Sequence, residues 1–186
     1  SPAETAVESP AATDAAQPEE SQAAEPTETV KLVVGASPAP HAEILEAVKP
    51  LLAEQGIELE IEEFTDYVLP NQALEAGDLD ANYFQHLPYL AQYNGSVSEA
   101  EQLVPVIYTH FEPMAIYAGT KTSLDDLADG DKIAIPNDPV NENRALLLLQ
   151  DAGLIKLPEG TSLESTCTPL DVVENPKNLE LVELNA

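Results

Sequence analysis

Arg144 is the only arginine in this chain of 186 residues, which carries 34 acidic residues against 7 basic ones. Lysine would be sufficient for a surface ion pair in such a protein. The single arginine therefore indicates a role that lysine cannot fill. The planar guanidinium group holds a carboxylate with two parallel hydrogen bonds, which an ammonium group cannot do. We therefore expect Arg144 to bind the carboxylate of a small ligand. A surface ion pair with Glu142 or Asp151 is the alternative that the sequence leaves open.

Arg144 lies in one of three polar and aromatic segments that each follow a predicted strand. Ligands of open α/β sheets bind at the carboxyl ends of the strands, so these segments predict a common site. Aromatic residues gathered in loops, rather than alternating along strands, favour a ligand pocket. The segments are residues 64–71 (FTDYVLPN), 80–86 (DANYFQH) and 137–144 (NDPVNENR).

The three histidines, His41, His86 and His110, suggest a metal site as a second hypothesis, with Asp66 as a further ligand. Their spacing matches no local ligand motif, and no two of them are four residues apart on a helix. We therefore expect no resident metal and no cofactor, and we expect His86 to donate a hydrogen bond to a ligand. The single cysteine, Cys167, excludes an intrachain disulfide and a thiolate-rich metal centre.

Hydrophobic periodicity predicts an α/β fold with parallel sheets, because strands and helices alternate along the chain. Pro50 is expected to kink or split the first helix. The last predicted strand ends close to Ala186, where a doubly wound lobe would normally continue, so we expect a truncated second lobe. The predicted strands are residues 30–34, 57–61, 103–108, 114–118, 132–135 and 179–184, and the predicted helices are residues 42–54, 70–76 and 144–152.

A net charge of −27 argues against nucleic acid as a partner, because binding phosphates requires basic patches. No window of 18 consecutive apolar residues predicts a membrane span. Residues 1–29 consist almost entirely of Ala, Pro, Glu, Ser and Thr, a composition that predicts a disordered tether.

Five blocks, in order, resemble the NlpA/MetQ family, the methionine-binding lipoproteins of bacterial ABC importers. Together they extend over nearly the whole chain beyond the tether, which makes the resemblance far more specific than any single short motif. The blocks are residues 34–45 (VGASPAPHAEIL), 66–71 (DYVLPN), 80–86 (DANYFQH), 135–139 (IPNDP) and 171–179 (DVVENPKNL).

The resemblance implies a type II periplasmic-binding fold of two lobes with parallel-rich sheets, the second of them incomplete. It implies a tether at residues 1–29, a first lobe at 30–112 and a second lobe at 113–186. In the family an arginine and an asparagine bind the amino-acid head group, while aromatic residues surround the ligand's side chain. The positions that correspond here are Arg144 and Asn141 for the head group, and Tyr67, Phe84, Tyr89 and His86 around the side chain.

The function implied is a receptor at the extracytoplasmic face of the membrane, not an enzyme. It would bind L-methionine or a related amino acid and deliver it to the permease of an ABC importer. A lipid anchor on a cysteine ahead of Ser1 would hold it to the cell envelope. The alternatives are a metal-binding surface receptor or secreted metalloenzyme built on His41, His86 and His110, and a purely structural surface protein. The sequence does not distinguish L- from D-methionine.

Overall fold

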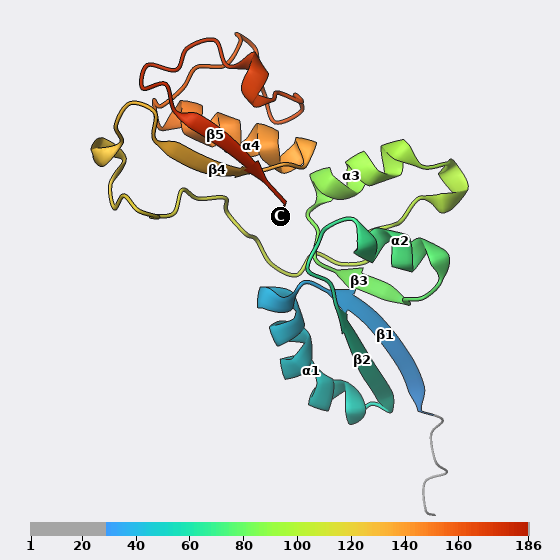
Figure 1. The fold of residues 1–186 in the computed structure, drawn as a ribbon. Coiled ribbons are helices and arrows are strands. Elements are labelled where there is room, and N and C mark those ends of the chain that lie inside the picture. The colour runs from blue at the N-terminus through green and yellow to red at the C-terminus, as the bar shows by residue number, and fades with distance from the viewer. Residues whose placement is uncertain (1–28, 186) are drawn as a thin grey trace, which may run out of the picture.

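The computed structural model describes residues 29–185 and contains two small parallel sheets flanked by helices (Figure 1). The first sheet has the order β2-β1-β3, with β1 (Val30–Ala36), β2 (Ile57–Glu63) and β3 (Ala81–Tyr83). The second pairs β4 (Lys132–Pro136) with β5 (Glu180–Leu184). We call the first sheet with its helices the first lobe, and the second sheet with its helix the second lobe. The predicted α/β class with parallel sheets is confirmed, whereas all but the last residue of the predicted tether lies outside the described residues.

The first lobe forms because β1 is apolar enough to be the central strand of its sheet. Val34 and Ala36 are buried, and β1 pairs in parallel with β2 from Val30 to Ala36. The strand continues through Gly35, where a Cβ atom would lie 2.6 Å from a methyl group of Leu79. Glycine is therefore required for this close packing. The helices of this lobe are η1 (Pro38–Ala42), α1 (Glu43–Ala53), α2 (Leu69–Ala76) and α3 (Leu87–Ser96).

Of the predicted kink or split at Pro50, the split is wrong, because α1 runs through this residue. Pro50 lies in the last turn of the helix, so only a short helical stretch follows the missing N–H group. The amide of Glu54 donates to the carbonyl of Pro50 at 3.3 Å, which continues the helical hydrogen bonding past the proline.

The second lobe is built around α4 (Pro139–Asp151), whose leucines pack against β4 and β5. Leu146 is fully buried and Leu149 is nearly so. Gly153 follows the helix with a φ of +72°, the left-handed conformation that ends many helices at glycine. The buried core comprises Ile135, Ala145, Leu146, Leu149, Leu154, Ile155, Leu157 and Leu179. Short 3-10 helices occur at η2 (Glu99–Glu101), η3 (Leu124–Asp126) and η4 (Pro169–Asp171).

The strands predicted at residues 103–108 and 114–118 are wrong. Residues 102–118 contain no helix or strand and form the connection between the lobes, which we call the connecting segment. An apolar run favours an extended backbone, but a strand also needs a partner for its hydrogen bonds. No described strand pairs with this segment, and most of its apolar side chains are exposed, Val106 by 87% and Phe111 by 85%. Met114 and Ile116 are partly buried against the core of the second lobe.

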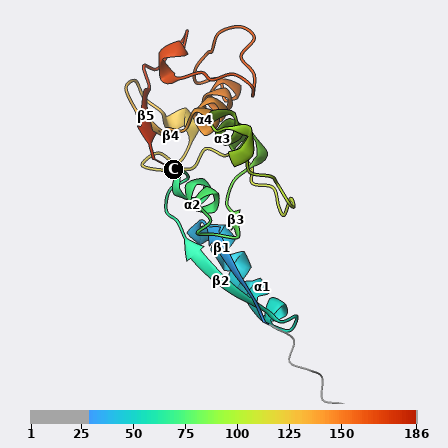
Figure 2. The ribbon, with the colours of Figure 1, turned by 90° about the vertical axis from the view of Figure 1, so that its right-hand side faces the viewer.

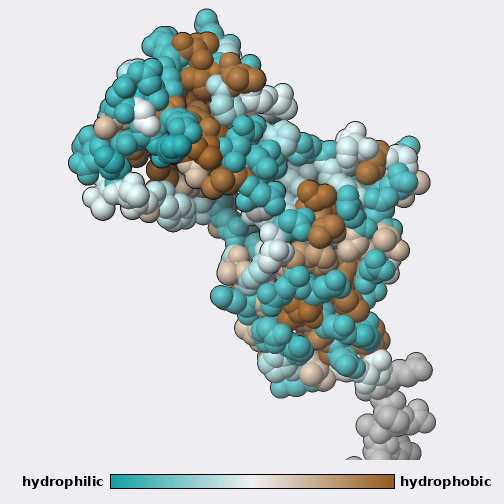
Figure 3. Space-filling model, in the orientation of Figure 1, coloured by the Kyte–Doolittle hydropathy of each residue, from teal (hydrophilic) through white to brown (hydrophobic). Residues whose placement is uncertain are grey.

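The two lobes meet at α3 and α4, which contact each other. The two helices approach at their ends in Figure 1, and Figure 2 gives the view turned by 90°. Residues near the carboxyl ends of β2, β3 and β4 lie at this junction. Over the face seen in Figure 3, hydrophobic side chains gather on the second lobe and form smaller groups on the first. None of the helices in the described range 29–185 has both the length and the apolar character that a membrane crossing requires.

Candidate functional site

The segments at residues 64–71 and 137–144 follow β2 and β4, as predicted, whereas residues 80–86 contain the short strand β3, which was not predicted. Tyr67 lies in the loop after β2, Phe84 and His86 follow β3, and Asn141 and Arg144 belong to the helix after β4. Tyr89 lies on the first turn of α3. Because carboxyl ends of parallel strands meet at the same edge of a sheet, side chains distant in sequence come together at the junction of the lobes.

Tyr67, Phe84 and Tyr89 pack on one another and form what we call the aromatic cluster. The ring centroids of Tyr67 and Phe84 are 5.9 Å apart, and each of these rings lies 6.0 Å from that of Tyr89. These separations and the inclined or edge-on orientations are the ones that aromatic pairs prefer. The Tyr89 hydroxyl donates to the Tyr67 carbonyl at 2.9 Å, so the cluster is also fixed by a hydrogen bond.

His86, Asn141 and Arg144 form a second group, the polar cluster, which joins the two lobes. Nη1 of Arg144 donates to Oδ1 of Asn141 at 2.8 Å and lies 3.1 Å from Nε2 of His86. Arg144 takes part in no ion pair among residues 29–185, so the pairing with Glu142 or Asp151 considered from the sequence is not formed. The guanidinium charge therefore has no carboxylate partner within the described protein.

The protonation of His86 fits this arrangement. Burial lowers the pKa of His86, and the neighbouring charge of Arg144 lowers it further. The imidazole is thus neutral at pH 7, and its Nε2 accepts a hydrogen bond from the guanidinium group. A guanidinium has five N–H donors, of which two belong to Nη1. The two contacts of Nη1 leave the N–H groups of Nη2 and Nε without a partner among the described residues.

The first turn of α4 positions Asn141 and Arg144. Asp138 is the N-cap residue, and its Oδ1 accepts from the backbone amide of Asn141 at 2.9 Å and from its side-chain amide at 3.0 Å. Pro139 follows at the first helical position, where its missing N–H group costs nothing. The helix thus begins at Pro139, and the start predicted at Arg144 is wrong. The Asp-Pro pair is the signal that would have located this start.

Polar side chains behind the first-lobe segment hold it in place. Nε2 of Gln85, between Phe84 and His86, donates to Oδ1 of the buried Asn71 at 2.7 Å. Nδ2 of Asn82 donates to the same oxygen at 2.9 Å. Because Gln85 is anchored on one side of the chain, its two neighbours are presented to the junction on the other.

Glu142 is a buried acid next to the polar cluster. Its side chain is almost inaccessible, and Oε1 has no hydrogen-bond partner among the described residues. Burial, followed by the charge of Glu183, raises the pKa of Glu142 to about 7. The turn that carries Arg144 therefore contains a carboxyl group that is partly protonated near neutral pH.

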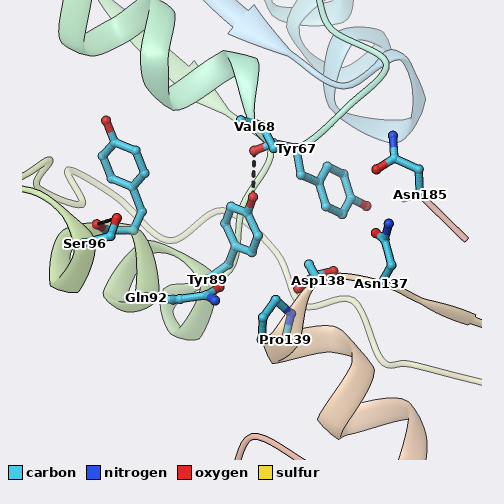
Figure 4. A pocket seen from close by; sticks show the side chains of 10 residues that line it. Tyr67, Val68, Tyr89, Gln92, Ser96, Asn137, Asp138, Pro139 and Asn185 are labelled. Atoms are coloured by element: carbon cyan, nitrogen blue, oxygen red, sulfur yellow. Dashed lines mark hydrogen bonds between the residues drawn. The ribbon is translucent and has the colours of Figure 1, made fainter. Parts of the chain in front are cut away.

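A cavity of about 390 Å³ opens between the lobes, and two rings of the aromatic cluster form part of its wall (Figure 4). Tyr67 and Tyr89 line one side, while Asp138 and Pro139 at the start of α4 line the other. Phe84, His86, Asn141 and Arg144 are not part of this lining, so the cavity adjoins the polar cluster without including it. Val68, Asn137, Asp138 and Pro139 belong to the predicted segments but were not singled out as ligand-binding residues. Residues outside those segments complete the wall, and the sequence did not indicate them: Gln92, Tyr93, Ser96 and Asn185.

The three histidines considered as a metal site do not come together. His41 and His110 lie next to each other, with ring centroids 5.3 Å apart. His86 instead contacts Arg144, and Asp66 accepts hydrogen bonds from the backbone amides of Val68 and Leu69 at the start of α2. A site made of all three histidines is therefore not formed.

Comparisons with known proteins show which proteins this chain resembles. The chain is 48% identical to the D-methionine-binding lipoprotein MetQ of Escherichia coli K12 over 158 residues, which are 84% of this chain and 55% of that protein. The crystal structure of the methionine-binding protein MetQ matches with a TM-score of 0.77 and 46% identity, over 84% of this chain and 62% of that one. A nutrient-binding protein from Burkholderia cenocepacia, solved bound to methionine, matches with a TM-score of 0.77 and 44% identity, over 83% and 64% of the two chains.

The chain thus spans about half the length of the E. coli relative. Its sequence matches the NlpA lipoprotein family over residues 32–186, which is nearly everything beyond the predicted tether. With the α/β fold, the parallel sheets and these matches in agreement, the chain belongs to the NlpA lipoprotein family.

Proposed function

We propose that this protein binds methionine, or a closely related apolar amino acid, between its two lobes. The observation that carries the proposal is the guanidinium group of Arg144, which has N–H donors to spare and no carboxylate partner within residues 29–185. The ligand's carboxylate would accept from these donors in the paired geometry that arginine favours. The side-chain amide of Asn141 stands beside the same group and would help to orient the ligand.

The aromatic cluster supports methionine in particular. A thioether is polarizable and makes favourable contacts with aromatic rings at a distance of about 5 Å. Tyr67, Phe84 and Tyr89 provide three such rings close to the polar cluster. His86 links the two, because it occupies the N-cap position of α3, which carries Tyr89, and its side chain contacts Arg144. The ligand's charged end and its apolar end would therefore each find a suitable environment.

The role we infer is that of a receptor for an ABC importer at the extracytoplasmic face of the membrane. Membership of a lipoprotein family supports attachment to the envelope through a lipid anchor. Ligand binding between two lobes favours their closure, a change that a permease can detect. The methionine-binding relatives support the same role, since two of them carry methionine in their descriptions and a third is a methionine complex.

The single arginine makes a direct test possible, because a nitrogen-15 NMR spectrum contains one arginine Nε–H signal. L-Methionine, D-methionine and 3-(methylthio)propylamine, which lacks the carboxylate, are titrated in turn. We expect methionine to shift this signal saturably and the amine to bind at least about tenfold more weakly, since a hydrogen bond to a charged group contributes roughly 1.5–3 kcal/mol. Equal binding of the amine, or no saturable shift with either methionine, would overturn the proposal. A difference between the two enantiomers would identify the preferred one.

A further inference from the structure

A second group of titratable side chains, distinct from the polar cluster, lies where the connecting segment crosses the first lobe. His41 belongs to η1, just after β1, and Tyr83 is the last residue of β3. His110 and Glu112 come from the connecting segment. The group therefore ties a segment without regular secondary structure to the carboxyl end of the first sheet.

The ligating atoms of His41, His110 and Glu112 converge, all within 4.8 Å of one another. Oε1 of Glu112 lies 2.6 Å from Nε2 of His110 and 3.8 Å from Nε2 of His41. A tetrahedral metal with bonds of about 2.0–2.1 Å holds its ligand atoms about 3.3 Å apart. The two separations lie on either side of that value, so small side-chain rotations would suffice to reach it.

The other nitrogen of each imidazole already has a partner that suits a metal ligand. Nδ1 of His41 lies 3.3 Å from the Ser37 hydroxyl, and Nδ1 of His110 lies 2.7 Å from the Tyr83 hydroxyl. When Nδ1–H donates to these oxygens, each Nε2 presents a lone pair toward Glu112. Metal-bound histidines are commonly oriented in this way by an acceptor on the far nitrogen.

Two imidazole lone pairs and a carboxylate facing one another repel unless a proton or a cation lies between them. The site is reachable, because the Glu112 side chain is 51% exposed and that of His110 is 29% exposed. The net charge of −27 also draws divalent cations toward the protein.

We propose that His41, His110 and Glu112 form a binding site for a divalent cation of the Zn²⁺ class. Two imidazoles with one carboxylate favour Zn²⁺ and its neighbours over Mg²⁺ or Ca²⁺, which prefer oxygen ligands. Three protein ligands leave a fourth position open for water. The bound ion would fasten the connecting segment to the first lobe, and so would restrict the movement of one lobe relative to the other.

The test is an isothermal calorimetric titration of the metal-free protein with ZnCl₂, in the absence of any amino acid. We expect one saturable site that Mg²⁺ in large excess does not occupy. Glu112→Gln and His110→Gln should each weaken Zn²⁺ binding at least about tenfold. Both side chains are partly exposed, so both variants should fold, which circular dichroism checks. Co²⁺ as a probe should give a visible absorption band of a low-coordinate nitrogen and oxygen site, and Glu112→Gln should abolish it.

Two matched variants separate this site from nonspecific binding. His86→Gln removes a histidine from the polar cluster, and Glu99→Gln removes a negative charge from the exposed η2 helix. Both should bind Zn²⁺ as the unmodified protein does. The proposal is wrong if Glu112→Gln and His110→Gln bind Zn²⁺ as tightly as the unmodified protein, or if no saturable Zn²⁺ binding occurs. In that case the side chains of His41, His110 and Glu112 share only a proton.

Discussion

The aromatic cluster and the polar cluster face the same junction but differ in how far the protein satisfies them. The three rings of the aromatic cluster pack on one another, and the Tyr89 hydroxyl has its partner in the Tyr67 carbonyl. The polar cluster keeps unpartnered N–H donors on Arg144. One end of the site is thus complete without a ligand, whereas the other presents an unbalanced charge.

This difference indicates a division of roles. An unbalanced charge recognises what all amino acids share, the carboxylate, and should dominate affinity. A complete apolar surface discriminates among ligand side chains. One methylene group more or less changes the binding free energy by only about 1 kcal/mol. The polar cluster also has a cost in stability, because it is built on a helix turn that contains the buried Glu142. Mutations at the two ends should therefore have effects of different kinds and sizes.

The largest effect we expect concerns Glu142. With its pKa raised to about 7, the folded protein binds a proton that the unfolded chain has already lost above about pH 4.5. Stability is therefore highest below the unfolded pKa and falls as the pH rises to about 7. Between low and neutral pH, Glu142 should change the free energy of unfolding by up to about 3 kcal/mol, and Glu142→Gln should remove this change. At pH 8 the variant should therefore be more stable than the unmodified protein.

Urea denaturation at pH 4.5, 6 and 8 measures this effect. Glu99→Gln is the matched control, since it removes the same charge from an exposed position and leaves Glu142 in place. Parallel pH profiles for Glu142→Gln and Glu99→Gln would mean that general repulsion among the acidic residues, rather than Glu142, sets the pH dependence.

Next in size is Arg144→Lys, which keeps the charge but removes the paired geometry. We expect methionine affinity to fall at least about tenfold, equivalent to roughly 1.5–3 kcal/mol, as measured by calorimetry. Lys132→Arg, the reverse exchange at an exposed position of β4, should leave the affinity as it was. Unchanged binding by Arg144→Lys would remove the polar cluster from the ligand site.

Phe84→Leu should have a smaller and more selective effect. Leucine retains most of the apolar volume but loses the ring that a sulfur atom can contact. Methionine affinity should fall by about 0.5–1.5 kcal/mol relative to the affinity for norleucine, in which a methylene group replaces the sulfur. Competition calorimetry with the two ligands gives this difference directly. A parallel loss for both ligands would show that Phe84 contributes packing alone.

The smallest effect should come from Tyr89→Phe, which removes the hydrogen bond to the Tyr67 carbonyl and keeps the ring. We expect the free energy of unfolding to fall by about 0.5–1.5 kcal/mol. Methionine affinity should change less than it does in Phe84→Leu. A larger loss of binding than in Phe84→Leu would mean that the hydroxyl itself contacts the ligand.

The sequence identified several residues of the two clusters because they follow strands that can be recognised locally. β1, β2 and β4 are apolar or alternate in polarity, so the positions of Tyr67 and Asn141 at strand ends could be predicted. β3 has only three residues, too few to show any periodicity. The start of α4 was misplaced because the capping role of Asp138 was not recognised.

Other features could not be predicted because they depend on contacts between distant residues. The apolar residues at 103–108 have the composition of a strand, yet their pairing depends on a partner elsewhere in the chain, which no local pattern reveals. Asn185 reaches the cavity from the end of β5, and Tyr93 reaches it from α3, so neither carries a local signal. The convergence of His41 with His110 likewise requires the path of the connecting segment, which crosses the first lobe.

The double contact of Nη1 has a further consequence for binding. A free arginine side chain has about 2 kcal/mol of rotamer entropy, most of which is lost when its guanidinium group is immobilised. Asn141 and His86 hold Arg144 from two different lobes before any ligand arrives. Much of this ordering cost is therefore met during folding, and a carboxylate that enters the site encounters a donor whose direction is already set.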